Sequence, residues 1–308
     1  MDAMRANFEQ LEIATGASST AVIVNAQGLK LFVRAWSPDG GRPVRGVLVM
    51  VHGMTMYGGP FSCLARELAA QGMAVVAADL QGHGLSDCYE ALRGYVRRFS
   101  DYVDDTVQVM DWAAARHPGA PLFLLGESMG GTVVLQTLRR GSVAERVRGA
   151  VLLAPAVRVS PAVLPPRAIL PILRGLAAIF PRAEVPDDKV VAPENWKGAF
   201  GDQAFAEAAY ADPLMTLVRP RLKMVTHLAV WEGLWAHLED ITTPLLVAHA
   251  PEDTRTEYAY SKALIARAAS TDKELLTVPG GRHMLLLDRP EITSRVVGHL
   301  TEWLLSRC

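Results

Sequence analysis

LLGESMGG, residues 124–131, sets glycines on both sides of Ser128, between one apolar run and the next. A strand that turns sharply into a helix strains the backbone of its corner residue, and only small neighbours fit beside that residue. The hydroxyl is then exposed above the carboxyl edge of the sheet, and the N–H of Met129 lies at a helix N-terminus, where negative charge is favoured. The pattern therefore predicts that Ser128 is a nucleophile on a strand–turn–helix corner.

Continuous apolar runs, typical of strands buried on both faces, recur on either side of this corner. Helical patterns lie between several of them, at 61–71 and at 100–118, where Ser100 is the expected N-cap, and a last one covers 291–305. We therefore predict an α/β fold with a mostly parallel sheet covered by helices on both faces, preceded by an antiparallel hairpin that turns at Gln27-Gly28. The runs are GVLVMVHG (46–53), GMAVVAADLQGHG (72–84), PLFLLGESMGG (121–131), VRGAVLLAP (147–155), TPLLVAHAPED (243–253) and KELLTVPGGRH (273–283).

Residues 157–238 interrupt the alternation of strand and helix. The segment begins proline-rich, apolar and basic, and it continues without a strand signal. We expect it to be a helical cap, inserted between a first part of the core, 1–156, and a second part, 239–308. Within the cap, residues 163–182 combine apolar side chains with Arg167, Arg174 and Arg182, a composition that suits either an amphipathic lid on an anionic lipid surface or an ordinary helix packed on the core.

The composition of the chain argues against several classes of protein. The 308 residues are 50% hydrophobic and carry a formal net charge of −1, which gives no long-range attraction for nucleic acid. Three scattered cysteines form no disulfide framework, and the sequence has neither a signal-peptide pattern nor an apolar segment long enough to span a membrane. We expect an intracellular, cytoplasmic protein, either free or peripheral at a membrane or lipid-droplet surface.

A serine nucleophile needs a base, and the base needs an acid that holds its tautomer. His283 follows the last apolar run through two glycines and is the predicted base, whereas His117, His227, His237 and His299 lie in or beside helical patterns and are read as structural. For the acid, Glu252 and Asp253 follow the run at 243–253. Asp253 is preferred because it is the later of the two and clears the strand end, and Asp288 is a third choice.

Acyl transfer also requires two backbone donors for the developing oxyanion. The N–H of Met129 is one. The loop VHGMTMYGG after the first central run supplies the other, which we assign to Met54, while His52 is expected to brace that loop. The alternative reading of this loop is a plain glycine-rich turn.

With these residues placed, the chain resembles the α/β-hydrolase superfamily, and within it the monoacylglycerol lipase and lysophospholipase group, over residues 20 to 306. The resemblance rests on VHGMTMYGG (51–59), ADLQGHGLSD (78–87), FSDYVDDTVQVMDW (99–112), PLFLLGESMGG, YADPLM (210–215), TPLLVAHAPED and GGRHMLL (280–286). It implies a triad of Ser128, Asp253 and His283 with oxyanion donors at Met54 and Met129. The sequence departs from the group at Ala250, where glycine is frequent, and at Glu127, where many of its lipases have histidine.

The resemblance implies a serine hydrolase that cleaves carboxylic esters, foremost monoacylglycerols, through an acyl-enzyme on Ser128. The alternatives are a lysophospholipase, a carboxylesterase acting on phenolic or shikimate esters, an acyltransferase with an alcohol acceptor, and a receptor that has kept the pocket without turnover. The intact triad argues against the receptor. No metal-ligand spacing and no nucleotide-binding motif is present in the sequence, so we expect neither a metal nor a cofactor. The expected partner is a small-molecule or lipid ester.

Overall fold

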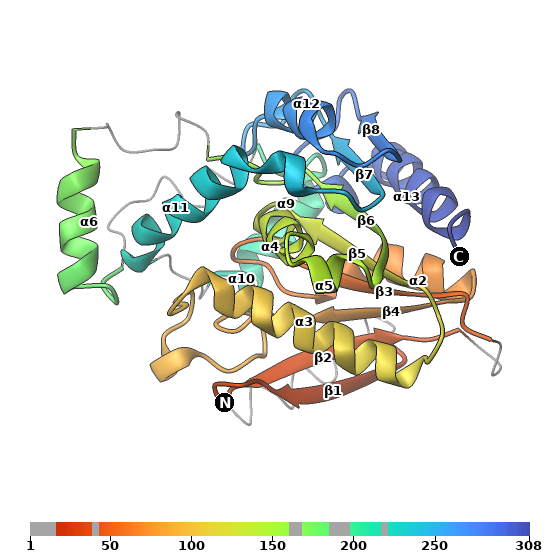
Figure 1. The fold of residues 1–308 in the computed structure, drawn as a ribbon, viewed down its shortest axis with the longest axis horizontal. Coiled ribbons are helices and arrows are strands. Elements are labelled where there is room, and N and C mark those ends of the chain that lie inside the picture. The colour runs from red at the N-terminus through yellow and green to blue at the C-terminus, as the bar shows by residue number, and fades with distance from the viewer. Residues whose placement is uncertain (1–16, 39–42, 160–167, 185–197, 217–220) are drawn as a thin grey trace.

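Eight strands form one sheet at the centre of the molecule (Figure 1). The computed structural model describes residues 17–38, 43–159, 168–184, 198–216 and 221–308. The strands occur in the spatial order β1-β2-β4-β3-β5-β6-β7-β8. Their bounds are Ser19–Val24 (β1), Lys30–Trp36 (β2), Gly46–Val51 (β3), Met73–Ala78 (β4), Leu122–Glu127 (β5), Val147–Leu153 (β6), Leu245–His249 (β7) and Lys273–Thr277 (β8).

The sheet is parallel except at one edge. β1 and β2 form the predicted antiparallel hairpin, with Gly28 at a positive φ of 78° in its turn, and β2 also runs antiparallel to β4. From β4 to β8 every neighbouring pair is parallel. Because parallel strands share one carboxyl edge, the loops after β3, β5, β7 and β8 open on the same side of the sheet, which is where the predicted site residues follow their strands.

Helices cover both faces, as the continuous apolar runs predict. In β3, Val47 and Val49 join the core under one set of helices, and Leu48 and Met50 join the core under the other. The first set is α3 (Phe99–Arg116), α4 (Met129–Leu138) and α12 (Tyr258–Arg267), and the second is α2 (Ser62–Ala70) and α13 (Pro290–Leu305). Short helical turns are η2 (Gly59–Phe61), η3 (Tyr89–Ala91), α5 (Gly141–Ala144), η4 (Leu238–Asp240) and η5 (Leu285–Leu287).

The start of α3 differs from the expectation. Ser100 lies inside the helix, and the N-cap is Arg98, two residues earlier. Asp101 accepts a hydrogen bond from the N–H of Arg98 at 3.2 Å and another from its guanidinium at 3.0 Å. Phe99 is buried, so the tertiary packing of the first turn and the acidic side chain at its third position outweigh the local preference for a serine cap.

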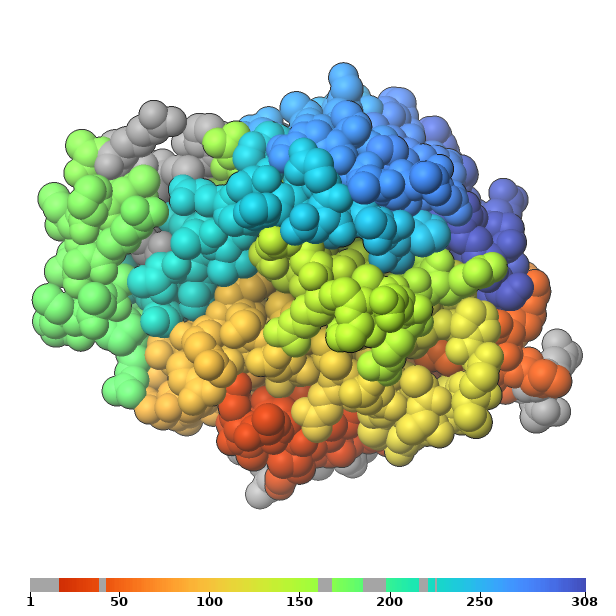
Figure 2. Space-filling view, in the orientation of Figure 1, coloured from red at the N-terminus to blue at the C-terminus, as the bar shows by residue number. Residues whose placement is uncertain are grey.

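Helices also occupy the segment between β6 and β7. They are α6 (Leu170–Ile179), α9 (Gln203–Ala211), α10 (Pro213–Thr216) and α11 (Lys223–Ala236). α11 packs on α4 of the core, and α6 stands at the edge of the molecule with α11 as its neighbour (Figures 1 and 2). Part of the expected lid, residues 163–167, lies outside the described residues. No helix within the described ranges is long and apolar enough to cross a membrane.

Candidate active site

Ser128 occupies the corner between β5 and α4, in a backbone conformation that few residues other than glycine adopt. Its φ is 54° and its ψ is −117°, which stores strain that the surrounding structure must hold. The neighbouring glycines are required by space: a Cβ on Gly126 would lie 2.5 Å from the carbonyl oxygen of Gly130, and a Cβ on Gly130 would overlap the carbonyl oxygen of Val51. The strand–turn–helix corner, or elbow, predicted from LLGESMGG is therefore present, with Ser128 partly exposed at its tip.

The loop after β3 approaches this corner closely. A Cβ added to Gly53 would lie 3.1 Å from Cβ of Ser128, so the absence of a side chain at position 53 allows the approach. His52 braces the loop as expected: its Nε2 accepts the N–H of Leu80 at 2.9 Å, and its Nδ1 donates to the Gly53 carbonyl at 2.8 Å. Burial lowers the pKa of His52 to about 4, so the imidazole is neutral. Its role is structural.

Asp79 holds the same loop in place through hydrogen bonds. The carboxylate, at the end of β4, accepts hydrogen bonds from the Arg34 guanidinium at 2.5 Å, the Gly58 N–H at 2.8 Å and the Leu85 N–H at 2.8 Å. Arg34 and Asp79 are both completely buried, and a buried ion pair is stable only when further hydrogen bonds satisfy its remaining atoms. The pair thus joins the loop after β3 to the loop ADLQGHGLSD after β4.

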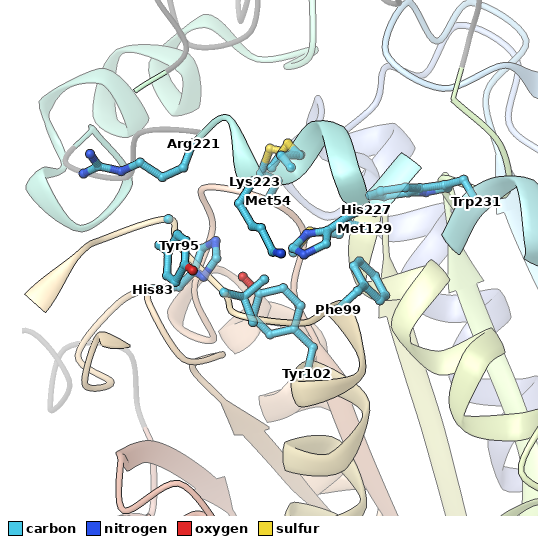
Figure 3. Close-up of a pocket in the computed structure, with 13 residues that line it drawn as sticks. Met54, His83, Tyr95, Phe99, Tyr102, Met129, Arg221, Lys223, His227 and Trp231 are labelled. Carbon is cyan, nitrogen blue, oxygen red and sulfur yellow. The ribbon is translucent and has the colours of Figure 1, made fainter. Parts of the chain in front are cut away.

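Met54 and Met129 border one cavity beside the elbow, as Figure 3 shows. Met129 is the first residue of α4, and the first N–H groups of a helix have no acceptor within the helix. Met54 directly follows Gly53. The two predicted oxyanion donors therefore belong to residues that border the same cavity, one directly after Ser128 and the other directly after Gly53, which lies close to Ser128. The rest of the lining comes from the loop after β4, from the start of α3 and from α11.

The structure brings Asp253 and His283 into contact. Oδ2 of Asp253 lies 2.7 Å from Nδ1 of His283, across loops that follow β7 and β8. Burial alone would raise the pKa of Asp253, but the attraction of His283, hydrogen bonds from His249 and His283, and the Arg255 N–H hold it well below its ordinary value. The carboxylate is thus ionised next to the imidazole, which leaves Nε2 of His283 as the atom that can accept a proton.

Two partners of Asp253 were missed by the sequence reasoning. His249, the last residue of β7, lies with its Nε2 3.1 Å from Oδ2 of Asp253 and its Nδ1 2.7 Å from the Ser261 hydroxyl. The Thr256 hydroxyl lies 2.8 Å from the same Oδ2. Both side chains are buried. The sequence offers one signal for His249, which is a polar residue at the end of an apolar strand. It offers no signal for Thr256, because the contact of Thr256 depends on how the loop folds back.

The other candidate acids have different partners. Glu252 is exposed and accepts the N–H of Gly280 at 3.0 Å. Asp288 is buried and accepts the N–H groups of Arg282 at 2.6 Å and Arg289 at 2.7 Å, so it fixes the loop that carries His283. Of the three acids that the sequence offered, Asp253 is the one in contact with the imidazole.

The loop after β6, which contains Ala154 and Ala156, connects the acid loop to the elbow through hydrogen bonds. The carbonyl of Ser128 accepts the N–H of Ala156 at 2.9 Å, and the Thr256 hydroxyl lies 3.1 Å from the Ala154 carbonyl. Between Ser128 and His283 themselves, both in described parts of the chain, no hydrogen bond is formed. Catalytic contacts of this kind are often long in a ligand-free enzyme and shorten when substrate binds.

Glu127 adds a buried carboxyl group directly before Ser128. It is 2% exposed, and its Oε1 has no hydrogen-bond partner among the described residues. Burial raises its pKa to about 7, and the attraction of His283 only partly opposes this rise. The elbow therefore carries a carboxyl group that is largely protonated just below neutral pH. Among the described residues, no three His, Cys, Asp or Glu side chains gather in a way that could hold a metal ion.

Comparison with known proteins identifies the family. A family model described as "Serine aminopeptidase, S33" matches residues 42–290. The chain belongs to this family. It is 30% identical to the monoglyceride lipase of Homo sapiens over 291 residues, covering 92% of this chain and 90% of that protein. It is also 30% identical to the monoacylglycerol lipase of Mycolicibacterium smegmatis over 283 residues, covering 89% and 95% of the two chains.

A solved structure supports the same fold. The soluble variant of monoglyceride lipase from Saccharomyces cerevisiae in complex with a substrate analogue superposes with a TM-score of 0.81 at 22% identity, covering 94% of this chain and 97% of that one. The predicted α/β-hydrolase fold and the resemblance to monoacylglycerol lipases are thereby confirmed, as is the prediction that this enzyme is an ester hydrolase of the lipase and esterase class.

Proposed function

We propose that this enzyme hydrolyses monoacylglycerols through an acyl-enzyme formed on Ser128. The observation that carries the proposal is the pairing of Asp253 and His283 on loops that share the carboxyl edge of the sheet with the strained serine corner. A serine, a carboxylate and an imidazole in this order along the chain are the elements of acyl transfer on this fold.

Each residue has one task in the proposed reaction. His283 takes the proton of Ser128 through Nε2 while Oγ attacks the ester carbonyl, and Asp253 stabilises the imidazolium that forms. The N–H groups of Met54 and Met129 bind the oxyanion of the tetrahedral intermediate. The alcohol leaves with the proton from His283, and water repeats the two steps on the acyl-enzyme. The products are a fatty acid and glycerol.

The relatives named monoglyceride and monoacylglycerol lipase support the choice of substrate.

The surface of α6 supports the proposal that the enzyme takes this substrate from a lipid surface. Along this helix and its two flanking residues, five large apolar side chains recur at helical spacing and are exposed, and Arg174 is exposed beside them. We propose that this face lies on an anionic lipid surface. The five are Ile169, Ile172, Leu176, Ile179 and Phe180, with exposed fractions from 40% to 70%.

The test uses wild type and Ser128→Ala with a fluorophosphonate label and a panel of monoacylglycerols, lysophospholipids and phenolic esters. We expect the label on wild type alone, turnover fastest with a monoacylglycerol, and loss of turnover in Ser128→Ala with an unchanged melting temperature. Retained turnover in Ser128→Ala would overturn the assignment of the nucleophile. Labelling without glyceride turnover would keep the acyl-enzyme and reject the proposed substrate.

A further inference from the structure

Two buried imidazoles line the cavity that Met54 and Met129 border, and the proposed triad uses neither of them. His83 comes from the loop after β4, and His227 comes from α11 (Figure 3). We propose that they form a subsite for one hydroxyl group of the ester substrate. The inference rests on the proposed function, because it concerns the substrate of the same site.

Both imidazoles leave a polar atom without a protein partner. His83 is 2% exposed and His227 is 8% exposed, and Nε2 of each has no hydrogen-bond partner among the residues that the structure describes. Burying such an atom unpaired destabilises the folded state, so its presence calls for a specific reason. Because two such atoms line one cavity beside the predicted oxyanion donors, substrate binding is that reason.

The other ring nitrogen defines what each Nε2 can bind. Nδ1 of His83 lies 3.2 Å from the Gln81 carbonyl, which can only accept, so Nδ1 carries the proton. The His227 ring donates to the Arg97 carbonyl, and Nδ1 is the donor because Nε2 is unpaired. Burial lowers the pKa of His83 to about 3 and that of His227 to about 4. Both Nε2 atoms are therefore neutral acceptors, and they require a ligand that donates.

The volume of the cavity and its other lining residues indicate that the donating ligand group is a hydroxyl. The cavity has a volume of about 20 Å³, room for one water-sized group. Lys223 lines it too, so an ammonium donor is available to a ligand atom that also accepts. A hydroxyl donates its one proton to one of the two Nε2 atoms and accepts a hydrogen bond from Lys223. A carboxylate or phosphate would face the lone pairs of both imidazoles, and an ether or ketone oxygen has no proton to donate.

The hydroxyl must lie within a few bonds of the ester carbonyl, because Met54 and Met129 border the same cavity. It can belong to the alcohol part, as in a glycerol ester, or to the acyl part, as in a 3-hydroxyacyl ester. Three soluble esters separate these sources: glycerol monobutyrate, propyl butyrate and propyl 3-hydroxybutyrate. We expect wild type to favour one of the two hydroxylated esters over propyl butyrate by about five-fold or more in kcat/KM, as the loss of a paired hydrogen bond predicts.

His227→Phe tests the subsite directly. The ring stays aromatic beside Phe99 and Trp231, and the acceptor is removed. We expect the preference for the hydroxylated ester to fall to about two-fold or less, and His227→Gln, which keeps an acceptor, to retain part of it. His237→Phe changes an exposed histidine at the other end of α11 and is the matched control, with the preference of wild type.

Each outcome of this experiment decides the inference. Equal kcat/KM of wild type for all three esters, or an unchanged preference in a folded His227→Phe, would reject the hydroxyl subsite while leaving the proposed ester hydrolysis intact. If His227→Phe does not fold, His227→Gln decides in its place: a reduced preference supports the subsite, and a preference equal to that of wild type rejects it. Absence of both fluorophosphonate labelling and turnover of any ester would reject the proposed function and the subsite together.

Discussion

Oδ2 of Asp253 lies 2.7 Å from Nδ1 of His283, whereas the adjacent Glu252 is exposed and contacts the N–H of Gly280. Asp253→Asn removes the charge that stabilises the imidazolium and favours the wrong tautomer of His283. We expect kcat to fall about 10³- to 10⁴-fold. Steady-state hydrolysis of a soluble short-chain ester measures this.

Glu252→Gln is the matched control for that substitution, and we expect its kcat to stay within about three-fold of wild type, because Glu252 is exposed and its hydrogen bond to Gly280 lies on the surface. If Glu252→Gln lost activity and Asp253→Asn kept it, the assignment of the acid would move by one residue. Comparable mild effects of both would mean that His283 needs no acid in this enzyme.

The close approach of Gly53 to Ser128 gives a second prediction. A Cβ at position 53 would lie 3.1 Å from Cβ of Ser128, so the loop that carries Met54 must retreat by a few tenths of an ångström in Gly53→Ala. Small displacements of a catalytic donor are costly, and we expect kcat to fall about 10- to 100-fold with the melting temperature little changed. Gly298→Ala, in α13 with open space around it, is the control: it should keep full activity and gain up to about 1 kcal/mol of stability. Full activity in Gly53→Ala would mean that Met54 does not contribute a donor.

The fold could be predicted from the sequence because its signals are local. Continuous apolar runs ending in glycines located the parallel strands, and the spacing of Gly126, Ser128 and Gly130 located the elbow. Both features depend on residues within one element and its turn. The order of strand, serine, acid and histidine along the chain then placed Asp253 and His283 on the same edge of the sheet.

The side-chain contacts that the sequence does not predict depend on tertiary packing, whether the two partners are near or far apart along the chain. His249 is the last residue of an apolar run, and its Nε2 lies 3.1 Å from Oδ2 of Asp253. The sequence predicts a structural role for His227, yet this residue lines the cavity beside Met129, because α11 packs on α4 next to the elbow. Arg98 replaced Ser100 as the cap of α3 because Phe99 is buried. Side-chain partners of this kind depend on tertiary packing, which periodicity and turn residues do not encode.

Glu127 predicts an unusual dependence of stability on pH. Burial raises its pKa from about 4.5 to about 7, so between these values the folded protein holds a proton that the unfolded chain releases. The contribution of Glu127 to the free energy of unfolding therefore falls as pH rises through this window. Three buried imidazoles, those of His52, His83 and His227, have lowered pKa values and act in the opposite direction below about pH 6.5.

Substitution isolates the Glu127 contribution from that of the histidines. Relative to wild type, we expect Glu127→Gln to gain about 2 kcal/mol in the free energy of unfolding between pH 5 and pH 8, since it has no charge to bury. Urea unfolding across this range measures the difference. Glu145→Gln, at an exposed position on the surface, should show no such trend. A flat difference for Glu127→Gln would show that its carboxyl group is ionised in the folded protein at pH 5.

The exposed face of α6 gives the last prediction. α6 lies at the edge of the molecule (Figure 2). Its Ile172 and Ile179 are 62% and 70% exposed, and burying such side chains in lipid is worth up to about 1.5–3 kcal/mol each. Replacing both with serine should weaken binding to vesicles that contain anionic lipid by about ten-fold or more, and slow hydrolysis of micellar monoacylglycerol much more than that of a soluble short-chain ester. Val22→Ser, which removes an exposed apolar side chain from β1, should change neither. Equal losses on micellar and soluble esters would mean that α6 shapes the substrate pocket and does not contact lipid.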